Sequence, residues 1–188
     1  MGLSINNMAN IERGVTIILK ALGEDITREG IKDTPKRVAK LYADILDSQY
    51  TTIDIPTTFT QETYHGIVMV HHIPFYAFCE HHLLPFIGHF AVGYIPDKKL
   101  VGLSKLVRMF RYWTKRVTIQ ERLAEQAVDT MMEQLEPHGA IVYISAEHTC
   151  MSLRGVKSPG AKTTTITSRG VFLSDLELRS QFISEASK

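Results

Sequence analysis

The sequence has few of the features that mark special classes of protein. Only two of its 188 residues are cysteine, and its formal net charge is +1. Two cysteines do not make a disulfide scaffold, and a near-neutral chain has no global field to attract nucleic acid or a membrane surface. The apolar runs are far shorter than a membrane span, and residues 1–14 lack the apolar core of a secretory signal. We therefore expect a soluble, cytoplasmic protein that binds neither nucleic acid nor membrane.

The chain does contain enough apolar residues for one sizeable core, at 44% of the composition. In its first part, apolar residues recur at helical spacing over residues 10–25 and 33–48. Gly23 is expected to end the first helix, and Asp33, Thr34 and Pro35 to begin the second. The expected apolar faces consist of Ile11, Val15, Ile18, Leu19 and Leu22 in the first helix, and of Val38, Leu41, Tyr42 and Ile45 in the second. A polar connection over residues 51–63 follows.

From residue 64 the pattern changes to strands and helices in the order ββααββ. Residues 65–73 and 89–96 are rich in β-branched and aromatic residues, which favours strands. Helices are predicted over 103–117 and 118–136, strands over 139–150 and 162–172, and a short helix near 175–183. We expect an α+β fold, with a four-stranded antiparallel sheet and a helix pair on one face. The N-terminal helices or a partner subunit would have to cover the other face.

This order of elements also predicts the domain organisation. Residues 1–63 are expected to form an N-terminal helical region and residues 64–188 a second domain, with the two making one structural unit overall. No internal repeat is visible, and no linker rich in glycine, proline or serine separates the two.

The two cysteines each lie close to histidines. Cys79 and His82 have the C-x-x-H spacing of two ligands on one tight turn, and His148 precedes Cys150 by the spacing that puts two strand residues on one face. Two thiolates and one imidazole, with His81 also nearby, would form a zinc site whose fourth position stays open for water. An open position is typical of catalysis, because zinc lowers the pKa of bound water. The alternative is that the cysteines are ordinary buried residues and the histidines ordinary polar ones.

A second feature is a group of cations near predicted helix starts. A helix N-terminus with free N–H groups favours phosphate, and the chain has no phosphate-binding loop of the G-x-x-x-x-G-K-[ST] type. Any triphosphate would have to be bound by side chains and a helix end. The candidates are Arg37, Lys40, Ser104, Lys105, Arg108 and Arg154. Alternatively, each is a solvated surface residue.

Gln120 and Glu121 form a third candidate, at the start of the long helix predicted over 118–136. A buried glutamate can accept two N–H bonds from a purine edge. The alternative is that Glu121 only stabilises the first turn, where the helix dipole favours a negative charge.

Taken in order, several motifs resemble those of the GTP cyclohydrolase I family. The resemblance covers residues 11 to 172, which is nearly the whole chain. It rests on GEDITREGIKDTPKRVAKLY, CEHHLLPF, VGLSKLVR, IQERL, HTCMSLRGV and TTTITSRGVF. The resemblance implies the tunnelling fold, in which ββααββ subunits join into barrels and assemble as a homodecamer with sites at subunit contacts.

The same motifs imply roles for individual residues. Cys79, His82 and Cys150 match the zinc ligands, and His81 and His148 match the catalytic histidines. The six candidate phosphate ligands match triphosphate contacts, and Gln120 and Glu121 match ribose and guanine contacts. The implied reaction converts GTP and water to 7,8-dihydroneopterin triphosphate and formate. Activated water attacks carbon 8 of guanine, His148 protonates the neighbouring nitrogen, and His81 moves protons at the ribose.

Two positions depart from the family pattern. Family members commonly have Asp where this chain has His72, and Ser where it has Ala77. The loss of that acid is expected to alter the support of a metal site beside it. Two further hypotheses stay open at this point. One is a nitrile reductase of queuosine synthesis, which has the same fold and a catalytic cysteine without zinc, and the other is a structural zinc-binding or pterin-binding module.

Overall fold

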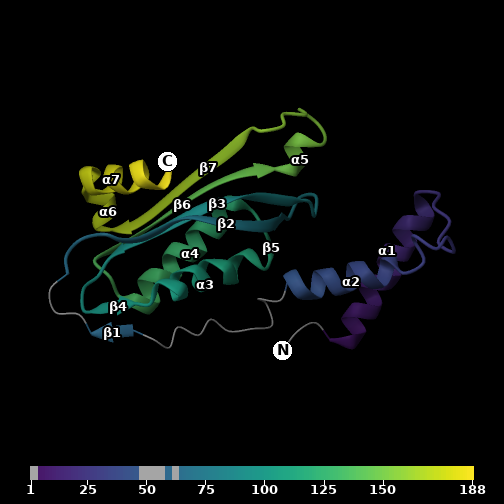
Figure 1. Ribbon diagram of the computed structural model, residues 1–188, viewed down its shortest axis with the longest axis horizontal. Helices are drawn as coiled ribbons and strands as arrows, with labels where there is room; N and C mark the ends of the chain where they lie inside the picture. The colour runs from purple at the N-terminus through teal and green to yellow at the C-terminus, as the bar shows by residue number, and fades with distance from the viewer. Residues whose placement is uncertain (1–3, 47–57, 61–63) are drawn as a thin grey trace. The chain divides into compact units, whose positions relative to one another are not determined.

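The computed structural model describes residues 4–46, 58–60 and 64–188 (Figure 1). The chain divides into two compact units, with the division between residues 52 and 53. The domain boundary expected between residues 63 and 64 falls at the edge of a stretch outside the described residues, and it stays a prediction. Among the described residues, no helix is long and apolar enough to cross a membrane.

The N-terminal unit contains two helices, α1 (Ile5–Ala21) and α2 (Thr34–Ile45). The Ser4 side chain accepts a hydrogen bond from the Asn7 amide and so caps the start of α1. Gly23, with a φ of 81°, follows the end of α1, where a left-handed conformation is needed. Pro35 lies in the first turn of α2, as expected. Asp33 is the N-cap residue, but its side chain makes no capping hydrogen bond.

The two helices bury little apolar surface. Ala39 is the one residue with a buried side chain among those described in this unit, at 0% exposure. Ile18, Leu22 and Leu41 are 59, 73 and 50% exposed. The expectation that Leu41 belongs to a buried stripe is therefore wrong within this unit. Two helices can cover only the sides that they turn toward each other, so the other apolar side chains have no cover within this unit.

The larger unit is built on a five-stranded mixed sheet in the order β5-β2-β3-β6-β7. Four of its strands are antiparallel neighbours: β2 (Val68–Cys79), β3 (Pro85–Ile95), β6 (Gly139–His148) and β7 (Lys162–Gly170). The short strand β5 (Val117–Thr118) pairs in parallel with the end of β2. The four longer strands were predicted from the sequence. The expectation of a purely antiparallel, four-stranded sheet is wrong, because β5 adds a fifth strand that pairs in parallel.

A second, two-stranded sheet joins β1 (Thr58–Thr60) to β4 (Lys99–Val101). Strand β1 falls inside the stretch expected to be a polar connection. The remaining residues of that stretch lie outside the described residues.

Helices cover both faces of the five-stranded sheet (Figure 1). On one face, α3 (Leu103–Thr114) and α4 (Gln120–Leu135) enclose the main core, which includes Phe86, Phe90 and Leu123. On the other face, α6 (Val171–Ser174) and α7 (Leu176–Ala186) pack Phe172 and Phe182 against the sheet. The C-terminal helices therefore supply cover that we had expected from the N-terminal helices or a partner subunit.

The strand register defines two ends of the sheet. At the end we call the Cys79 end, Phe78 pairs with Pro85, and Phe86 pairs with His148. Helix α5 (Thr149–Ser152) and β5 lie at this end. At the opposite end, which we call the β4 end, Ile95 pairs with Gly139 and the chain continues into β4. An 11-residue strand such as β3 separates the two ends by roughly 30 Å.

Candidate metal centre and its surroundings

A tight turn after β2 brings Cys79 and His82 side by side. The Cys79 amide donates to the Leu84 carbonyl at 2.9 Å, and the Leu83 amide donates to the Cys79 carbonyl at 2.9 Å. Leu83 has a φ of 54°, an uncommon conformation for a residue with a side chain. The turn therefore folds back within a few residues, and both side chains face the same side.

Cys150 reaches the same place from α5, at the end of β6. The Thr149 hydroxyl donates to the Pro85 carbonyl at 2.6 Å, which ties the start of α5 to the start of β3. The ligand atoms of Cys79, His82 and Cys150 all lie within 4.8 Å of one another. We call these three residues the metal trio.

The chemistry of the trio fits a divalent metal ion. Tetrahedral zinc bonds of about 2.3 Å to sulfur and 2.0–2.1 Å to nitrogen put these ligand atoms about 3.5–3.8 Å apart, within the limit observed here. Burial, followed by the charge and hydrogen bonding of Cys79, raises the pKa of the Cys150 thiol. A metal binds the thiolate, so binding is coupled to the release of protons.

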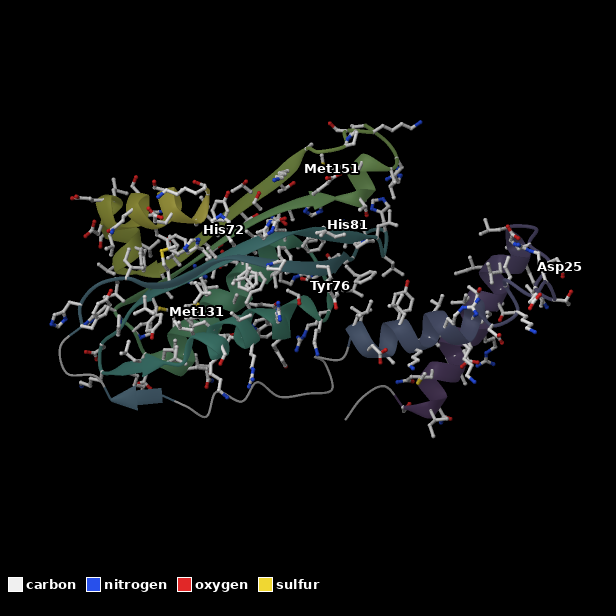
Figure 2. All side chains as sticks on the ribbon, viewed as in Figure 1. Asp25, His72, Tyr76, His81, Met131 and Met151 are labelled. Carbon is white, nitrogen blue, oxygen red and sulfur yellow. The ribbon has the colours of Figure 1, made fainter. Side chains whose placement is uncertain are left out.

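Two further histidines surround the trio. His81 Nδ1 lies 3.7 Å from Cys79 Sγ, and Figure 2 shows His81 at the same end of the sheet as Met151, the neighbour of Cys150. His148 stacks on Phe86 with ring centroids 4.7 Å apart and planes 1° from parallel. Burial lowers the pKa of His148, and the nearby Glu121 charge partly opposes this effect. Both expected catalytic histidines therefore lie beside the trio.

Arg154, Gln120 and Glu121 also reach the Cys79 end. Arg154 Nη1 donates to His82 Nε2 at 2.8 Å. Gln120 and Glu121 form the first turn of α4, directly after β5. Gln120 Oε1 lies 3.0 Å from His148 Nε2, and the Gln120 side chain is fully buried, whereas Glu121 is exposed.

The sequence analysis missed two contacts at this end. Glu80, inside the turn that carries Cys79 and His82, pairs with both terminal nitrogens of Arg122 from α4, and Arg122 holds the pKa of Glu80 below its usual value. The second contact is the stacking of Phe86 on His148. Glu80 and Phe86 both belong to CEHHLLPF, and Arg122 belongs to IQERL, so the motifs contained the residues without indicating their partners.

Three of the expected phosphate ligands lie at the opposite end of this unit. Ser104, Lys105 and Arg108 occupy the first turns of α3, which begins directly after β4. Figure 1 shows β4 and β5 at opposite ends of α3, and a helix of 12 residues is about 18 Å long. One chain therefore does not bring these three residues to its own metal trio.

Arg37 and Lys40 lie in the N-terminal unit, both exposed on α2. Arg37 Nη2 donates to the Gly30 carbonyl and lies equally close to the Thr34 hydroxyl, at 2.9 Å in each case. These bonds hold the guanidinium on the surface of that unit.

One of the two departures from the family pattern, His72, lies away from the metal trio. His72 lies in the first half of β2, at a shift in register between Val70 and Ile73, and has a φ of 56°. Extended strand from there to Cys79 spans roughly 20 Å. Ala77 is fully buried in the main core. The expectation that His72 removes an acid next to the metal site is therefore wrong.

Comparison with known proteins gives one consistent family. A family model described as GTP cyclohydrolase I matches residues 11–187. A protein named GTP cyclohydrolase 1 from Geobacillus kaustophilus (strain HTA426) is 47% identical over 181 residues, which cover 95% of this chain and 96% of the relative. A protein of the same name from Carboxydothermus hydrogenoformans is 49% identical, covering 91% of this chain and 90% of the relative. A solved structure described as archaeosine synthase QueF-Like in the apo form superposes on 58% of this chain and 97% of its own, with a TM-score of 0.46 and 13% identity.

Proposed function

Because the chain belongs to the GTP cyclohydrolase I family, we propose that it converts GTP and water to 7,8-dihydroneopterin triphosphate and formate, the first step of pterin synthesis. One observation supports this proposal above the others. Two thiols and an imidazole from two segments of the chain converge within 4.8 Å, and two more histidines, His81 and His148, lie beside them. This arrangement combines a metal site with groups that exchange protons near neutral pH.

Zinc is the ion that we propose for the metal trio. Two thiolates and one imidazole are ligands that zinc favours, and three protein ligands leave a position for water. When bound, the ion supplies Lewis-acid chemistry by lowering the pKa of water at that position toward neutrality.

The residues around the trio account for the proton transfers. Water adds to carbon 8 of guanine, and the adjacent ring nitrogen needs a proton before the carbon–nitrogen bond breaks. His148, whose pKa is lowered by burial, is proposed to take up a proton and pass it to that nitrogen. His81 is proposed to move protons at the ribose oxygen during the later rearrangement. Glu121 is proposed to accept two N–H bonds from the guanine edge.

The triphosphate contacts lead to a proposal about assembly. Ser104, Lys105 and Arg108 begin at the β4 end, remote from the trio of their own chain. We propose that a second copy of the chain supplies these residues, so that each site lies at a subunit contact of a homo-oligomer, which the family resemblance implies is a decamer. Arg154, Arg37 and Lys40 are proposed to bind the same triphosphate. Binding energy from the remote phosphates would then orient the reacting base.

We also propose that the larger unit adopts the tunnelling-fold arrangement. Strands β2, β3, β6 and β7, with α3 and α4 between the pairs, follow the ββααββ order. On this proposal β5 is a local addition to the sheet, and residues 1–63 form a helical region before a catalytic domain of residues 64–188.

Turnover of GTP by the purified protein tests the function. We expect release of formate and, after oxidation, a fluorescent pterin, both lost on chelation and restored by zinc. A zinc-loaded protein that yields neither product would refute the proposal.

Two variants separate the metal site from proton transfer. Cys150→Ser is expected to lose the metal and all turnover. His148→Ala is expected to keep the metal, since the trio is intact, and to lose ring opening. Metal content by mass spectrometry and formate release measure the two effects. Undiminished turnover by His148→Ala would refute the proposed role of His148 in proton transfer.

A further inference from the structure

Gln120 is a polar side chain held inside the protein at the Cys79 end. Its side chain is 0% exposed, although it begins a helix. The side-chain nitrogen donates to the Thr163 carbonyl at 3.0 Å and to the Ile144 carbonyl at 3.4 Å, and it lies 3.0 Å from the Thr165 hydroxyl. A carbonyl oxygen only accepts hydrogen bonds. The two carbonyls therefore fix which end of the amide is nitrogen.

The orientation of this amide determines the protonation of His148. With the nitrogen facing β6 and β7, the amide oxygen faces His148, and Oε1 lies 3.0 Å from Nε2. An amide oxygen has no proton to donate, so Nε2 must carry one. In the neutral ring, Nδ1 then has the free lone pair. In the charged ring, Nδ1 carries the second proton.

A second contact fixes the plane of the ring. Phe86, itself 0% exposed, lies opposite His148 in the register of β3 and β6. The two rings are 4.7 Å apart and 1° from parallel. No hydrogen bond to His148 Nδ1 occurs among the residues that the structure describes. The amide and the phenyl ring together hold one nitrogen and leave the other available.

We propose that Gln120 is a positioning residue, which keeps His148 in the Nε2–H form and confines its proton exchange with substrate to Nδ1. The inference rests on the proposed function, because it assigns His148 the role of exchanging protons with GTP. It differs from the direct ribose or guanine contact that the family resemblance implies for Gln120. The Gln120 amide is fully buried, and its nitrogen and oxygen both have partners within the chain, so it presents no exposed group to a substrate.

Nitrogen NMR tests the proposal directly in the metal-loaded protein. Histidine labelled with ¹⁵N distinguishes the two neutral tautomers, and the His148 signals are assigned by their absence in His148→Ala. We expect Nε2 to be protonated and Nδ1 not. A neutral His148 with its proton on Nδ1 would overturn the proposal, and this measurement requires neither turnover nor an altered Gln120.

A substitution tests the kinetic consequence. Gln120→Met keeps the length of the side chain and removes both the donor and the acceptor. We expect kcat for GTP to fall about 10–100-fold, the loss typical when a partner that orients a functional histidine is removed. KM is expected to change less than about threefold, and the metal content to stay the same. A direct substrate contact would instead raise KM, and an unchanged kcat would refute the positioning role.

The control variant is Thr165→Val, which removes one partner of the Gln120 nitrogen and leaves the two carbonyls. Its kcat and its His148 tautomer are expected to match those of the unaltered protein. If Gln120→Met fails to fold, the tautomer of the unaltered protein still decides the proposal. An unaltered protein with no GTP turnover refutes the proposed function, whereas normal turnover with the wrong tautomer refutes only the inference.

Discussion

The two units of the chain differ in what holds their functional residues in place. The larger unit has two buried clusters of side chains, one on each face of its sheet. In the N-terminal unit, Ala39 is the one buried side chain among the described residues. The metal trio, His148 and Gln120 all lie in the larger unit. Cys79 and Gln120 are buried there, whereas His82 is exposed on its turn and Cys150 is half-buried on α5. Arg37 and Lys40 lie on an exposed helix surface of the smaller unit.

This difference separates two kinds of functional group. A metal site and a proton-exchanging histidine need positions fixed within a fraction of an ångström, which a packed core provides. A cation that binds a phosphate tolerates a longer and looser side chain, because charge attraction acts over several ångströms. Of the candidate site residues, Cys79 belongs to the main core, and His148 stacks on Phe86, which also belongs to it.

The largest expected effect concerns the cores themselves. Leu123 on α4 is 0% exposed and Leu41 on α2 is 50% exposed. Leu123→Ala is expected to lower the free energy of unfolding by about 2–5 kcal/mol, and Leu41→Ala by about 0.5 kcal/mol or less. The two substitutions remove the same atoms from a helix, so burial is the main variable. Hydrogen exchange resolved by segment measures each loss in its own unit.

Contacts to α2 from outside the N-terminal unit would overturn this comparison of Leu41 with Leu123. If Leu41→Ala costs as much as Leu123→Ala, the apolar surface of α2 is covered in solution by something beyond its own unit. Equal losses would therefore show that the smaller unit gains its core from contacts that the isolated unit lacks.

A smaller effect is expected from the cations of the two units. Arg154 Nη1 lies 2.8 Å from Nε2 of His82, a member of the metal trio. Arg37 is hydrogen-bonded to Gly30 and Thr34. Arg154→Ala is expected to raise KM for GTP about 10–100-fold, the loss of one or two charged hydrogen bonds. Arg37→Ala is expected to raise KM in the same direction. Steady-state kinetics with GTP measures both, and Arg28→Ala, another arginine of the N-terminal unit, serves as the control. An unchanged KM for Arg37→Ala would remove Arg37 from the triphosphate contacts.

The smallest expected effect is a lowered carboxyl pKa, and in this respect the two units are expected to behave alike. Hydrogen bonds from Thr27 lower the pKa of Asp25 in the smaller unit, and hydrogen bonds from Ser152 and the Gly160 amide lower the pKa of Glu147 in the larger one. Each ionised carboxylate stabilises its unit above its unfolded pKa, and this contribution is lost as the pH falls through the lower folded pKa. Carboxyl ¹³C titration is expected to give both values below the ordinary ones.

Removal of the local donors provides the control for this last comparison. Thr27→Ala is expected to raise the pKa of Asp25, and Ser152→Ala that of Glu147. A pKa of Asp25 at its ordinary value in the unaltered protein would show that short local hydrogen bonds do not persist in a unit without a core.

The candidate site was predictable from sequence where its residues are local. The C-x-x-H spacing indicated that Cys79 and His82 lie together, because ligands on one turn are close whatever the rest of the fold does. The expected strand face shared by His148 and Cys150 is wrong, since β6 ends at His148 and Cys150 lies on α5. The role of Gln120 was not predictable. Its partners Ile144, Thr163 and Thr165 come from two other strands, and only the register of those strands brings them to the amide.

The fold shows the same limit. The longer strands and helices were predicted because their patterns extend over many residues, whereas β5, with only two residues, is too short to show a period. The apolar face of α2 was visible in the sequence, but a pattern of apolar residues does not say what covers it. The burial of Leu41 was therefore predicted wrongly: within its unit this side chain is exposed.

The distance between the Cys79 end and the β4 end has a consequence for inheritance. In the proposed homo-oligomer, a defect in the metal trio and a defect at Lys105 would damage different halves of each composite site. Two inactive chains, one with each defect, would then form some intact sites when they assemble together. Mutations at opposite ends of this one polypeptide would complement each other, as if they lay in two different genes.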